Sequence, residues 1–231
     1  MHHIAIIPAR GGSKRIPKKN IRDFNGAPII SYAIKNAINS NLFDRVIVST
    51  DNAEIEKIAK TFGAEVPFIR SKELSGDATP TVPVIRDAIL RVSETANQPA
   101  FVTAIYPCTP LLNPSDLTLA FSQLQACDAS YVFPVCVFPS PPERGLRLNT
   151  KMETKSVDAS NAWTRTQDIE DMFYDAGQFY CGRTSSWLDQ IELHNQSRAI
   201  ILPAWRAIDI DTDSDWTQAE QAHKLLSNLG S

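Results

Sequence analysis

Ile4-Ala-Ile-Ile-Pro-Ala-Arg-Gly-Gly-Ser-Lys-Arg-Ile-Pro-Lys-Lys-Asn20 is the stretch on which the predicted fold depends. It begins with a short, continuous apolar run, which is typical of a strand covered on both faces. A loop with two adjacent glycines follows, and we call residues 9–21 the basic loop after its cationic side chains, Arg10, Lys14, Arg15, Lys18 and Lys19. Adjacent glycines let backbone N–H groups approach phosphate oxygens, and an arginine can bind two such oxygens as a fork. The stretch therefore predicts a polyphosphate-binding loop at the carboxyl end of a buried strand.

The composition indicates one globular domain, residues 1–231, with enough apolar residues for a large core. Of the 231 residues, 43% are hydrophobic and 21% are charged, so disorder is not expected. A net charge of −3 argues against a general nucleic-acid-binding protein, which would be basic. No apolar stretch approaches the ~20 residues of a membrane span, and Pro8 interrupts the N-terminal apolar run. We therefore expect a cytoplasmic protein with neither a nucleic-acid nor a membrane partner.

The cysteines and histidines follow no catalytic or metal-binding pattern. The four cysteines show neither a CxxC pair nor zinc-like spacing, so we expect free thiols in a reducing compartment. A thiol nucleophile is conceivable at Cys108, but no histidine lies near it in sequence, and we expect it only to line a site. His194 and His223 lack a catalytic context and are expected on the surface or on a helix face.

Apolar runs and helical periodicities alternate along much of the chain. Strands are predicted at residues 4–8, 45–49, 101–105, 129–137, 177–181, 198–202 and 207–210. Helices are predicted at residues 28–39, 51–62, 80–94, from 113 and from 212, with caps at Asp51, Asn113 and Thr212. This alternation predicts a doubly wound, Rossmann-like α/β fold with a mostly parallel sheet and right-handed crossovers. Ligands of such sheets bind beyond the carboxyl ends of the strands, where the basic loop lies.

The alternation stops at residues 138–166, where prolines and polar residues replace it. We predict an inserted arm or hairpin that contacts a second copy of the chain, because long loops in compact domains usually have a function. The alternative is a flexible surface loop.

The basic loop matches neither of two common phosphate-binding motifs. A Walker A motif needs G-x-x-x-x-G-K-[ST], and here Lys14 stands between Ser13 and Arg15. The dinucleotide motif G-x-G-x-x-G fails as well, because the next glycine after Gly12 is Gly26. An anion-binding loop and a solvated basic loop remain, and the position after a buried strand favours anion binding.

Asp209 and Asp211 form a second candidate site near the other end of the chain. On an extended strand, residues i and i+2 face the same way, and two neighbouring carboxylates repel each other unless a cation or proton lies between them. Mg²⁺ is the natural cation near phosphates, since it takes few carboxylates together with phosphate oxygens. The alternative is a solvated acidic turn. Asp213 and Asp215 follow at a helix start, where acidic residues are expected for the helix dipole.

Several motifs together resemble those of the CMP-sialic acid synthetases and their relatives, cytidylyltransferases that activate acidic sugars. The first is Ala-Arg-Gly-Gly-Ser-Lys-Arg-Ile-Pro-Lys-Lys-Asn-Ile at residues 9–21. The others are Asp44-Arg-Val-Ile-Val-Ser-Thr-Asp51, Arg70 with Glu73-Leu74 and Asp77, Tyr106-Pro-Cys-Thr-Pro110 and Ile208-Asp-Ile-Asp-Thr212. The resemblance covers nearly the whole chain. Within the family, the Arg-Ile-Pro of the loop and Tyr174-Asp-Ala-Gly-Gln-Phe-Tyr180 most resemble the members that act on pseudaminic acid.

The resemblance implies a nucleotide-diphospho-sugar transferase-like fold, a homodimer whose arm reaches the neighbouring sugar site, and roles for individual residues. It implies CTP binding by Arg10, Gly11, Gly12, Ser13, Lys14, Lys19, Asn20, Arg70 and Asp77. It implies sugar binding by Tyr106, Thr109, Arg165, Asp175, Gln178, Phe179 and Tyr180, with Arg165 facing the sugar's carboxylate. Arg10, Lys19 and Asp211 are the expected catalytic residues, and Asp209 and Asp211 the expected Mg²⁺ ligands.

We thus expect a Mg²⁺-dependent enzyme that joins CTP to a nine-carbon acidic sugar, pseudaminic acid in the first instance, and releases pyrophosphate. The nearest alternative is the same reaction on N-acetylneuraminate or legionaminate. A glycosyltransferase that consumes a nucleotide-sugar, or a non-catalytic nucleotide-binding regulator, are alternatives from other classes.

Overall fold

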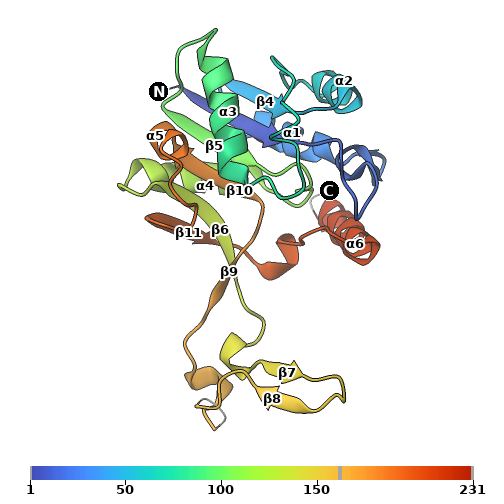
Figure 1. Ribbon diagram of the computed structural model, residues 1–231, viewed down its shortest axis with the longest axis vertical. Helices are drawn as coiled ribbons and strands as arrows, with labels where there is room; N and C mark the ends of the chain where they lie inside the picture. The colour runs from blue at the N-terminus through green and yellow to red at the C-terminus, as the bar shows by residue number, and fades with distance from the viewer. Residues whose placement is uncertain (1, 161–162, 230–231) are drawn as a thin grey trace.

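The computed structural model describes residues 2–160 and 163–229, and in that part of the chain a seven-stranded sheet forms the centre of the molecule (Figure 1). Six strands follow the order β11-β6-β10-β5-β1-β4, and β9 pairs with β6. The sheet strands are β1 (His3–Pro8), β4 (Arg45–Ser49), β5 (Phe101–Ile105), β6 (Tyr131–Val137), β9 (Phe173–Asp175), β10 (Phe179–Arg183) and β11 (Ser197–Ile201). The helices are α1 (Ile30–Asn39), α2 (Ala53–Thr61), α3 (Thr81–Ser93), α4 (Pro114–Gln125), α5 (Thr184–Leu188) and α6 (Asp213–Leu229).

The predicted doubly wound, mostly parallel sheet is confirmed, with one correction. β1 runs parallel to β4 and β5, and β11 runs parallel to β6. β10, however, lies antiparallel between β5 and β6, and β9 is antiparallel to β6. The sheet is therefore mixed, because the chain re-enters it through β9 and β10 after the arm and not through a helical crossover.

β9 and β10 together form one bent partner for β6. Asp175 pairs with Val135 and Cys181 pairs with Val132, so the span between them has three residues more than its partner. The extra residues include Gly177, whose φ of +61° suits glycine. Bulges of this kind bend a strand and redirect side chains, often beside active sites.

Alternate residues of β1 enter the hydrophobic cores on opposite faces of the sheet, as a strand's two-residue period requires. Ala5 and Ile7 pack with α1, α2 and α4. Ile4 and Ile6 pack with α3 and Trp187 of α5, and Figure 1 shows α3 across the near face of the sheet. Each fully buried isoleucine stabilises the fold by about 1.5–3 kcal/mol of transfer free energy, so this strand anchors both layers.

A third, smaller core joins the two ends of the chain. Ile16 of the basic loop and Phe24 of the hairpin β2 (Asp23–Phe24) and β3 (Ala27–Pro28) pack against Ile210 and Trp216. Ile16, Phe24, Ile210 and Trp216 are all buried. This cluster brings residues 209–211 beside the basic loop, although about two hundred positions separate them in sequence.

Most predicted elements are found, and some boundaries differ. Pro28 lies in β3, so α1 begins two residues after the predicted start. α2 is capped by Asn52 and not by Asp51, because the Asn52 side chain accepts bonds from the N–H groups of Glu54 and Ile55. The predicted caps at Asn113 and at Thr212 with Asp215 are confirmed. Residues 207–210 do not form the predicted strand, since no neighbouring strand pairs with them in the described chain.

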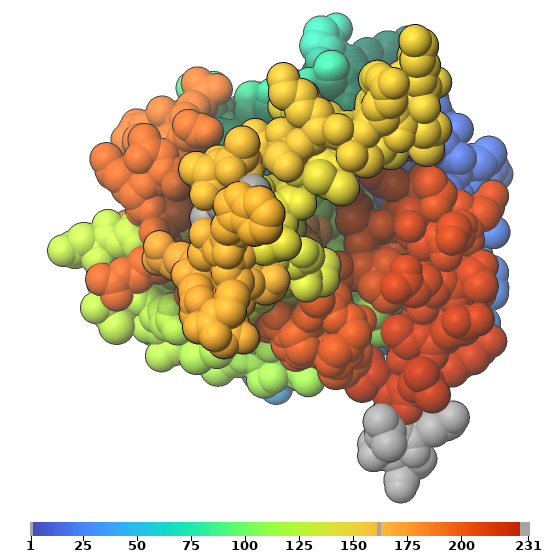
Figure 2. Space-filling view, turned by 90° about the horizontal axis from the view of Figure 1, so that it is seen from below, coloured from blue at the N-terminus to red at the C-terminus, as the bar shows by residue number. Residues whose placement is uncertain are grey.

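The predicted insertion is an arm that projects from the sheet between β6 and β9 (Figure 1). It holds a two-stranded ladder, β7 (Leu146–Leu148) with β8 (Thr154–Ser156), and returns as far as Met172, beyond the predicted end at 166. Residues 161–162 of the predicted arm lie outside the described residues. In Figure 2, seen from below, the arm is the yellow-to-orange part. Its exposed apolar side chains include Leu146, Leu148, Met152, Val157 and Trp163.

Among the described residues, none of the helices combines the length and the apolar character that crossing a membrane would require.

Candidate active site

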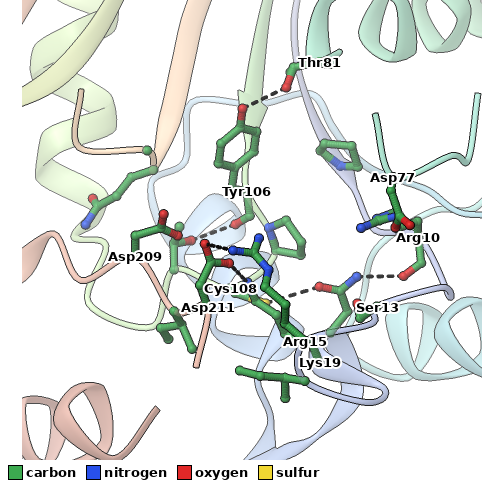
Figure 3. A pocket seen from close by; sticks show the side chains of 18 of the residues that line it. Arg10, Ser13, Arg15, Lys19, Asp77, Thr81, Tyr106, Cys108, Asp209 and Asp211 are labelled. Carbon is green, nitrogen blue, oxygen red and sulfur yellow. Dashed lines mark hydrogen bonds and ion pairs between the residues drawn. The ribbon is translucent and has the colours of Figure 1, made fainter. Parts of the chain in front are cut away.

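A cavity of about 390 Å³ lies where the basic loop, the residues after β5 and the segment before α6 meet (Figure 3). Its volume is in the range usual for small-molecule sites. The carboxyl ends of β1 and β5 open into it, as expected for an open α/β sheet. Among the described residues, its walls carry six cationic side chains, namely Arg10, Lys14, Arg15, Lys19, Arg70 and Arg206. Three carboxylates, Asp77, Asp209 and Asp211, face the same space, so the cavity has an excess of positive charge suited to a polyanion.

Asn20 holds the basic loop in shape. Its side-chain amide donates to the carbonyl oxygen of Arg10 at 2.9 Å, and its oxygen accepts from Cys108 at 3.2 Å. Burial raises the pKa of the Cys108 thiol to about 12, which leaves it protonated and unsuited to nucleophilic attack. The expected role of Cys108 as a lining residue agrees with its place in the cavity wall.

Gly11 and Gly12 do not line this cavity, although the sequence placed them at the phosphates. The N–H of Gly11 donates to Asp51 at 2.8 Å, so that donor is already used. A side chain at Gly11 would lie 2.7 Å from the amide nitrogen of Asn52, which explains the glycine by close packing. Ser13, by contrast, lines the cavity together with the cations of the loop.

The charged groups of the cavity pair with one another. Asp77 bonds to Arg10 and Lys14, and both hydrogen bonds, that of Lys14 first, hold the pKa of the Asp77 carboxyl below its usual range. Asp211 accepts from Arg15 at 2.5 Å and from Lys19 at 3.3 Å. Figure 3 shows these two clusters on opposite sides of the cavity. The carboxylates of Asp77 and Asp211 thus pair with cations that an anionic ligand would otherwise contact.

Asp209 lies beside Asp211 and differs from it. In the described chain Asp209 makes no ion pair. Burial, and then the neighbouring Asp211 carboxylate, raise the pKa of Asp209 above its ordinary value. A group of three or more metal-binding side chains is absent from the described residues. Two carboxylates on one wall fit a cation that completes its shell with phosphate and water oxygens, which is the manner of Mg²⁺.

Two buried polar atoms that belong to residues of the cavity wall lack a hydrogen-bond partner in the described structure. One is Nε of Arg70, whose residue is 4% exposed, and burial lowers the pKa of this guanidinium. The other is Oε1 of Gln178, also 4% exposed, whose amide nitrogen donates to the carbonyl of Arg206. Buried polar groups without partners are rare and destabilising, so each atom is a candidate for a bond to a ligand or to an ordered water.

Tyr106 and Thr109 lie on the cavity wall after β5, as expected. Thr109 donates its hydroxyl proton to the carbonyl of Tyr106 at 2.8 Å, and the hydroxyl of Tyr106 bonds to Thr81 at 2.7 Å. Thr81 at the start of α3 also lines the cavity.

Four predicted sugar-binding residues do not line the cavity of their own chain. Phe179 is fully buried in the core beneath the sheet. Asp175 and Tyr180 bond to each other behind Tyr106. Arg165 lies on the arm, is 72% exposed and pairs with Asp168.

The cavity residues that were absent from the predicted set include Arg15, Thr81 and Arg206. Arg15 belonged to the basic loop and was visible as a charge. Arg206 is held by an ion pair with the largely buried Asp116 at the start of α4. No local sequence pattern indicates the ion pair between Arg206 and Asp116, because ninety residues separate them.

Comparison with known proteins agrees with this geometry. The sequence model of a family described as "Cytidylyltransferase" matches residues 4–193. The chain is 38% identical to a pseudaminic acid cytidylyltransferase of Campylobacter jejuni over 97% of both chains. It is 34% identical to N-acylneuraminate cytidylyltransferase B of Danio rerio, over 95% of this chain and 51% of the relative.

The solved structures show the same fold at low sequence identity. A CMP:2-keto-3-deoxy-manno-octonic acid synthetase complexed with CTP matches 99% of both chains, with a TM-score of 0.72 and 16% identity. A 4-diphosphocytidyl-2C-methyl-D-erythritol synthase of Anaerococcus prevotii matches 98% of both chains, with a TM-score of 0.58 and 13% identity.

Proposed function

The chain belongs to the cytidylyltransferase family, and from this premise we propose that it joins CTP to a nine-carbon acidic sugar. The products are the CMP-sugar and pyrophosphate. The observation that carries the proposal is the cavity itself, where six cationic side chains face a pair of neighbouring carboxylates. A nucleoside triphosphate and an acidic sugar are both anions. Their reaction therefore needs cationic groups in one cavity that offset the negative charge of both substrates.

In this reaction the anomeric hydroxyl of the sugar attacks the α-phosphorus of CTP, and the bond to the β-phosphate breaks. Arg10 and Lys14 on one side of the cavity and Lys19 on the other would hold the triphosphate and the departing pyrophosphate between them. The unpartnered Nε of the buried Arg70 would donate to an oxygen of the nucleotide. Because the protein forms no covalent bond in this scheme, positioning and electrostatic stabilisation supply the catalysis.

Mg²⁺ is the metal that the residues present would accept. Asp209 and Asp211 offer two carboxylates beside the phosphate-binding cations, which fits Mg²⁺ bound jointly by protein and phosphate. When bound, the ion would supply charge neutralisation at the α-phosphate and polarise the incoming hydroxyl. Arg15 and Lys19, which now pair with Asp211, would then be released to the nucleotide.

Pseudaminic acid is the favoured sugar, because the relative from Campylobacter jejuni is similar along its whole length. Oε1 of Gln178 is a buried acceptor without a partner in the described chain, and it would accept from a hydroxyl or amide N–H of the sugar. N-acetylneuraminate and legionaminate carry comparable groups and remain alternatives, the former favoured by the similarity to the Danio rerio enzyme.

We further propose a homodimer in which the arm of each subunit reaches the other's cavity. The arm exposes several large apolar side chains, with Trp163 97% exposed, and such surface is usual where a partner docks. Arg165 on the same arm does not line the cavity of its own chain and pairs with Asp168. In a dimer it would be free to bind the sugar's carboxylate in the neighbouring subunit.

Purified protein incubated with CTP, Mg²⁺ and a panel of nonulosonic acids tests the proposed function. We expect pyrophosphate release that requires CTP and sugar together and is fastest with pseudaminic acid. A glycosyltransferase would instead consume a ready-made CMP-sugar in the presence of an acceptor. A regulator would bind CTP without turnover, and either of these results would overturn the proposal.

A further inference from the structure

Arg206 is a cation of the cavity wall to which the proposed reaction gives no role. It ends the short helix η4 (Ala204–Arg206), and its side chain is 15% exposed. The guanidinium donates to the carboxylate of Asp116 through both terminal nitrogens, from Nη1 to Oδ1 at 3.4 Å and from Nη2 to Oδ2. Two parallel bonds of this kind fix the plane of a guanidinium as well as its position.

The capping box of α4 holds Asp116 in place. The side chain of Asn113 accepts from the N–H of Ser115 at 2.9 Å, and the N–H of Asn113 donates to Oδ2 of Asp116 at 3.3 Å. The loop after β5, which carries Tyr106 and Thr109 on the cavity wall, leads directly into this helix start. The Asp116 carboxylate is therefore fixed relative to that wall.

The backbone of Arg206 is bonded to the same wall. Its carbonyl accepts from the side-chain amide nitrogen of Gln178 at 2.5 Å, and the carbonyl of Gln178 accepts from the N–H of Tyr106 at 2.8 Å. Asp209 follows Arg206 by three residues. Arg206 thus connects the wall of Tyr106 and Gln178 to the segment that carries the carboxylate pair.

The guanidinium of Arg206 keeps donors for a ligand. An arginine has five N–H groups in its side chain, and the two bonds to Asp116 use two of them. Among the described residues, Asp116 is the side-chain partner of this guanidinium. A second anion at Arg206 would lie near the Asp116 carboxylate and be repelled by it. The pair therefore suits a neutral oxygen better than another carboxylate.

We propose that Arg206 donates to a neutral oxygen of the sugar, a hydroxyl or an acyl carbonyl, and that Asp116 is the positioning residue that holds it there. The inference rests on the proposed function, because it assigns this wall to the sugar. In that reaction the nucleotide is bound by cations of the basic loop and by Arg70, whereas Arg206 is bonded to Gln178. The sugar's carboxylate is left to Arg165 of the partner subunit.

A double-mutant cycle with Asp116→Asn, Arg206→Gln and the double variant tests the proposal. Pyrophosphate release gives the KM for pseudaminic acid and the KM for CTP in each protein. A hydrogen bond to a charged group corresponds to about a 10- to 100-fold change in an equilibrium constant. We expect Arg206→Gln to raise the KM for pseudaminic acid by about that factor, with the KM for CTP within about twofold of wild type.

Asp116→Asn keeps one oxygen for the cap of α4 but removes the charge that holds the guanidinium. We expect it to raise the KM for pseudaminic acid by about 10-fold. The double variant should be no worse than Arg206→Gln alone, because Asp116 acts through Arg206.

Thermal unfolding separates this effect from loss of structure. Removing one partner leaves a buried charge unpaired, whereas the double variant removes both charges, so it should unfold at a higher temperature than either single variant. If a single variant does not fold, the double variant alone must show the raised KM for pseudaminic acid.

Arg45→Gln is the matched control. Arg45 also donates to a carboxylate through two nitrogens, to Glu65, and its side chain is 21% exposed, but it does not line the cavity. Both KM values should stay unchanged in this variant. Arg206→Lys keeps the charge without the two parallel bonds, so its KM for pseudaminic acid should lie between those of wild type and Arg206→Gln.

The outcomes distinguish the two proposals. A wild-type enzyme that turns over no nonulosonic acid with CTP would overturn the proposed function and this inference together. An active wild type with an unchanged KM for the sugar in Arg206→Gln, or with additive losses in the double variant, would overturn the inference alone. A rise confined to the KM for CTP would assign Arg206 to the nucleotide and would also overturn it. A lower KM for the sugar in Asp116→Asn would mean that the guanidinium binds an anionic group, and the neutral acceptor would then be wrong.

Discussion

At the scale of single residues, Asp77 pairs with two cations of the basic loop, Arg10 and Lys14. In the proposed complex with CTP, a phosphate group would have to displace it from both. We expect Asp77→Asn to tighten CTP binding by about 3- to 10-fold at low salt, because the neutral amide releases both cations. Titration calorimetry with CTP in the absence of divalent metal measures this.

The matched control for Asp77 is Asp213→Asn, since Asp213 pairs with Arg22 outside the cavity and should leave CTP binding unchanged. If Asp77→Asn weakened CTP binding instead, Asp77 would contact the nucleotide directly, as the family resemblance implies.

Asp211 should matter more for turnover than for binding. It lies beside Asp209 and contacts Arg15 and Lys19, so its removal leaves the cations in place while removing a carboxylate from the proposed Mg²⁺ site. We expect Asp211→Ala to lower kcat by about 100-fold or more, the effect usual for an electrostatic catalytic group, with CTP affinity changed less than about threefold. Pyrophosphate release at several Mg²⁺ concentrations measures it. Near-normal turnover would refute the metal-binding role.

The residues that the sequence predicted best are those whose chemistry is local. Arg10, Lys14 and Lys19 follow directly from a strand that ends in a basic loop, and all three line the cavity. Gly11 was placed at the phosphates by the same logic, but it does not line the cavity, and a side chain there would lie too close to Asn52. A sequence does not distinguish a glycine required by packing from a glycine required by a ligand, because the residue type is the same in both cases.

At the scale of elements, β1 carries a buried histidine that makes the sheet sensitive to acid. His3 bonds to Thr103 at 2.9 Å and stacks on Phe121. Burial lowers its pKa to about 3, opposed by Asp44 and reinforced by His2. The unfolded chain, with a histidine pKa near 6.5, binds the proton more readily. Stability from this group is therefore complete above about pH 6.5 and is lost progressively as the pH falls toward 3.

Because the pKa of His3 is lower in the folded state than in the unfolded chain, lowering the pH from 7 to 5 reduces the free energy of unfolding by about 2 kcal/mol. We expect urea unfolding to show a loss of that order in the wild-type protein. His3→Gln, which keeps a polar partner for Thr103 but does not titrate, should lose less over the same interval. Equal losses in the two proteins would mean that other groups dominate the acid response.

Elements differ in how far the sequence could foresee them. β1, β4 and β5 are continuous apolar runs buried on both faces, and their pattern identifies them without context. β10 was predicted near its place, but its antiparallel direction depends on the arm that precedes it. Residues 207–210 have an apolar–polar pattern typical of a strand, yet Ile210 is buried against Ile16 and Trp216. Alternation reports only which side chains are buried, and it does not identify what buries them.

At the scale of the whole molecule, the cavity assembles from parts that are distant in the chain. The small core around Ile16 and Trp216 joins the basic loop to the segment of Asp209 and Asp211. The sequence could suggest both parts separately, and the family resemblance joined them. The ion pair between Arg206 and Asp116 could not be foreseen. It depends on tertiary packing between residues that no short-range pattern relates.

The arm is the part of the molecule for which we propose a role between two subunits. Leu146 and Leu148 on β7 are 60% and 57% exposed, and a monomer gains nothing from placing them in water. We expect the wild-type protein to have about twice the 25.6 kDa mass of one chain. The double variant Leu146→Glu/Leu148→Glu should have the mass of one chain, because charges in an apolar interface are strongly unfavourable. Light scattering after size-exclusion chromatography measures this.

Leu119→Glu provides the control for the arm, since Leu119 is 50% exposed on α4, away from the arm, and the dimer should persist in it. Because Arg165 lies on the same arm, loss of the dimer should also raise the KM for the sugar and leave the KM for CTP nearly unchanged. A monomeric variant with an unaltered KM for the sugar would show that the arm joins subunits without completing the neighbouring site. A monomeric wild-type protein would leave Arg165 without a substrate to bind. The sugar's carboxylate would then have to be held by a cation of the cavity itself, such as Arg206, whose backbone carbonyl accepts from the amide of Gln178.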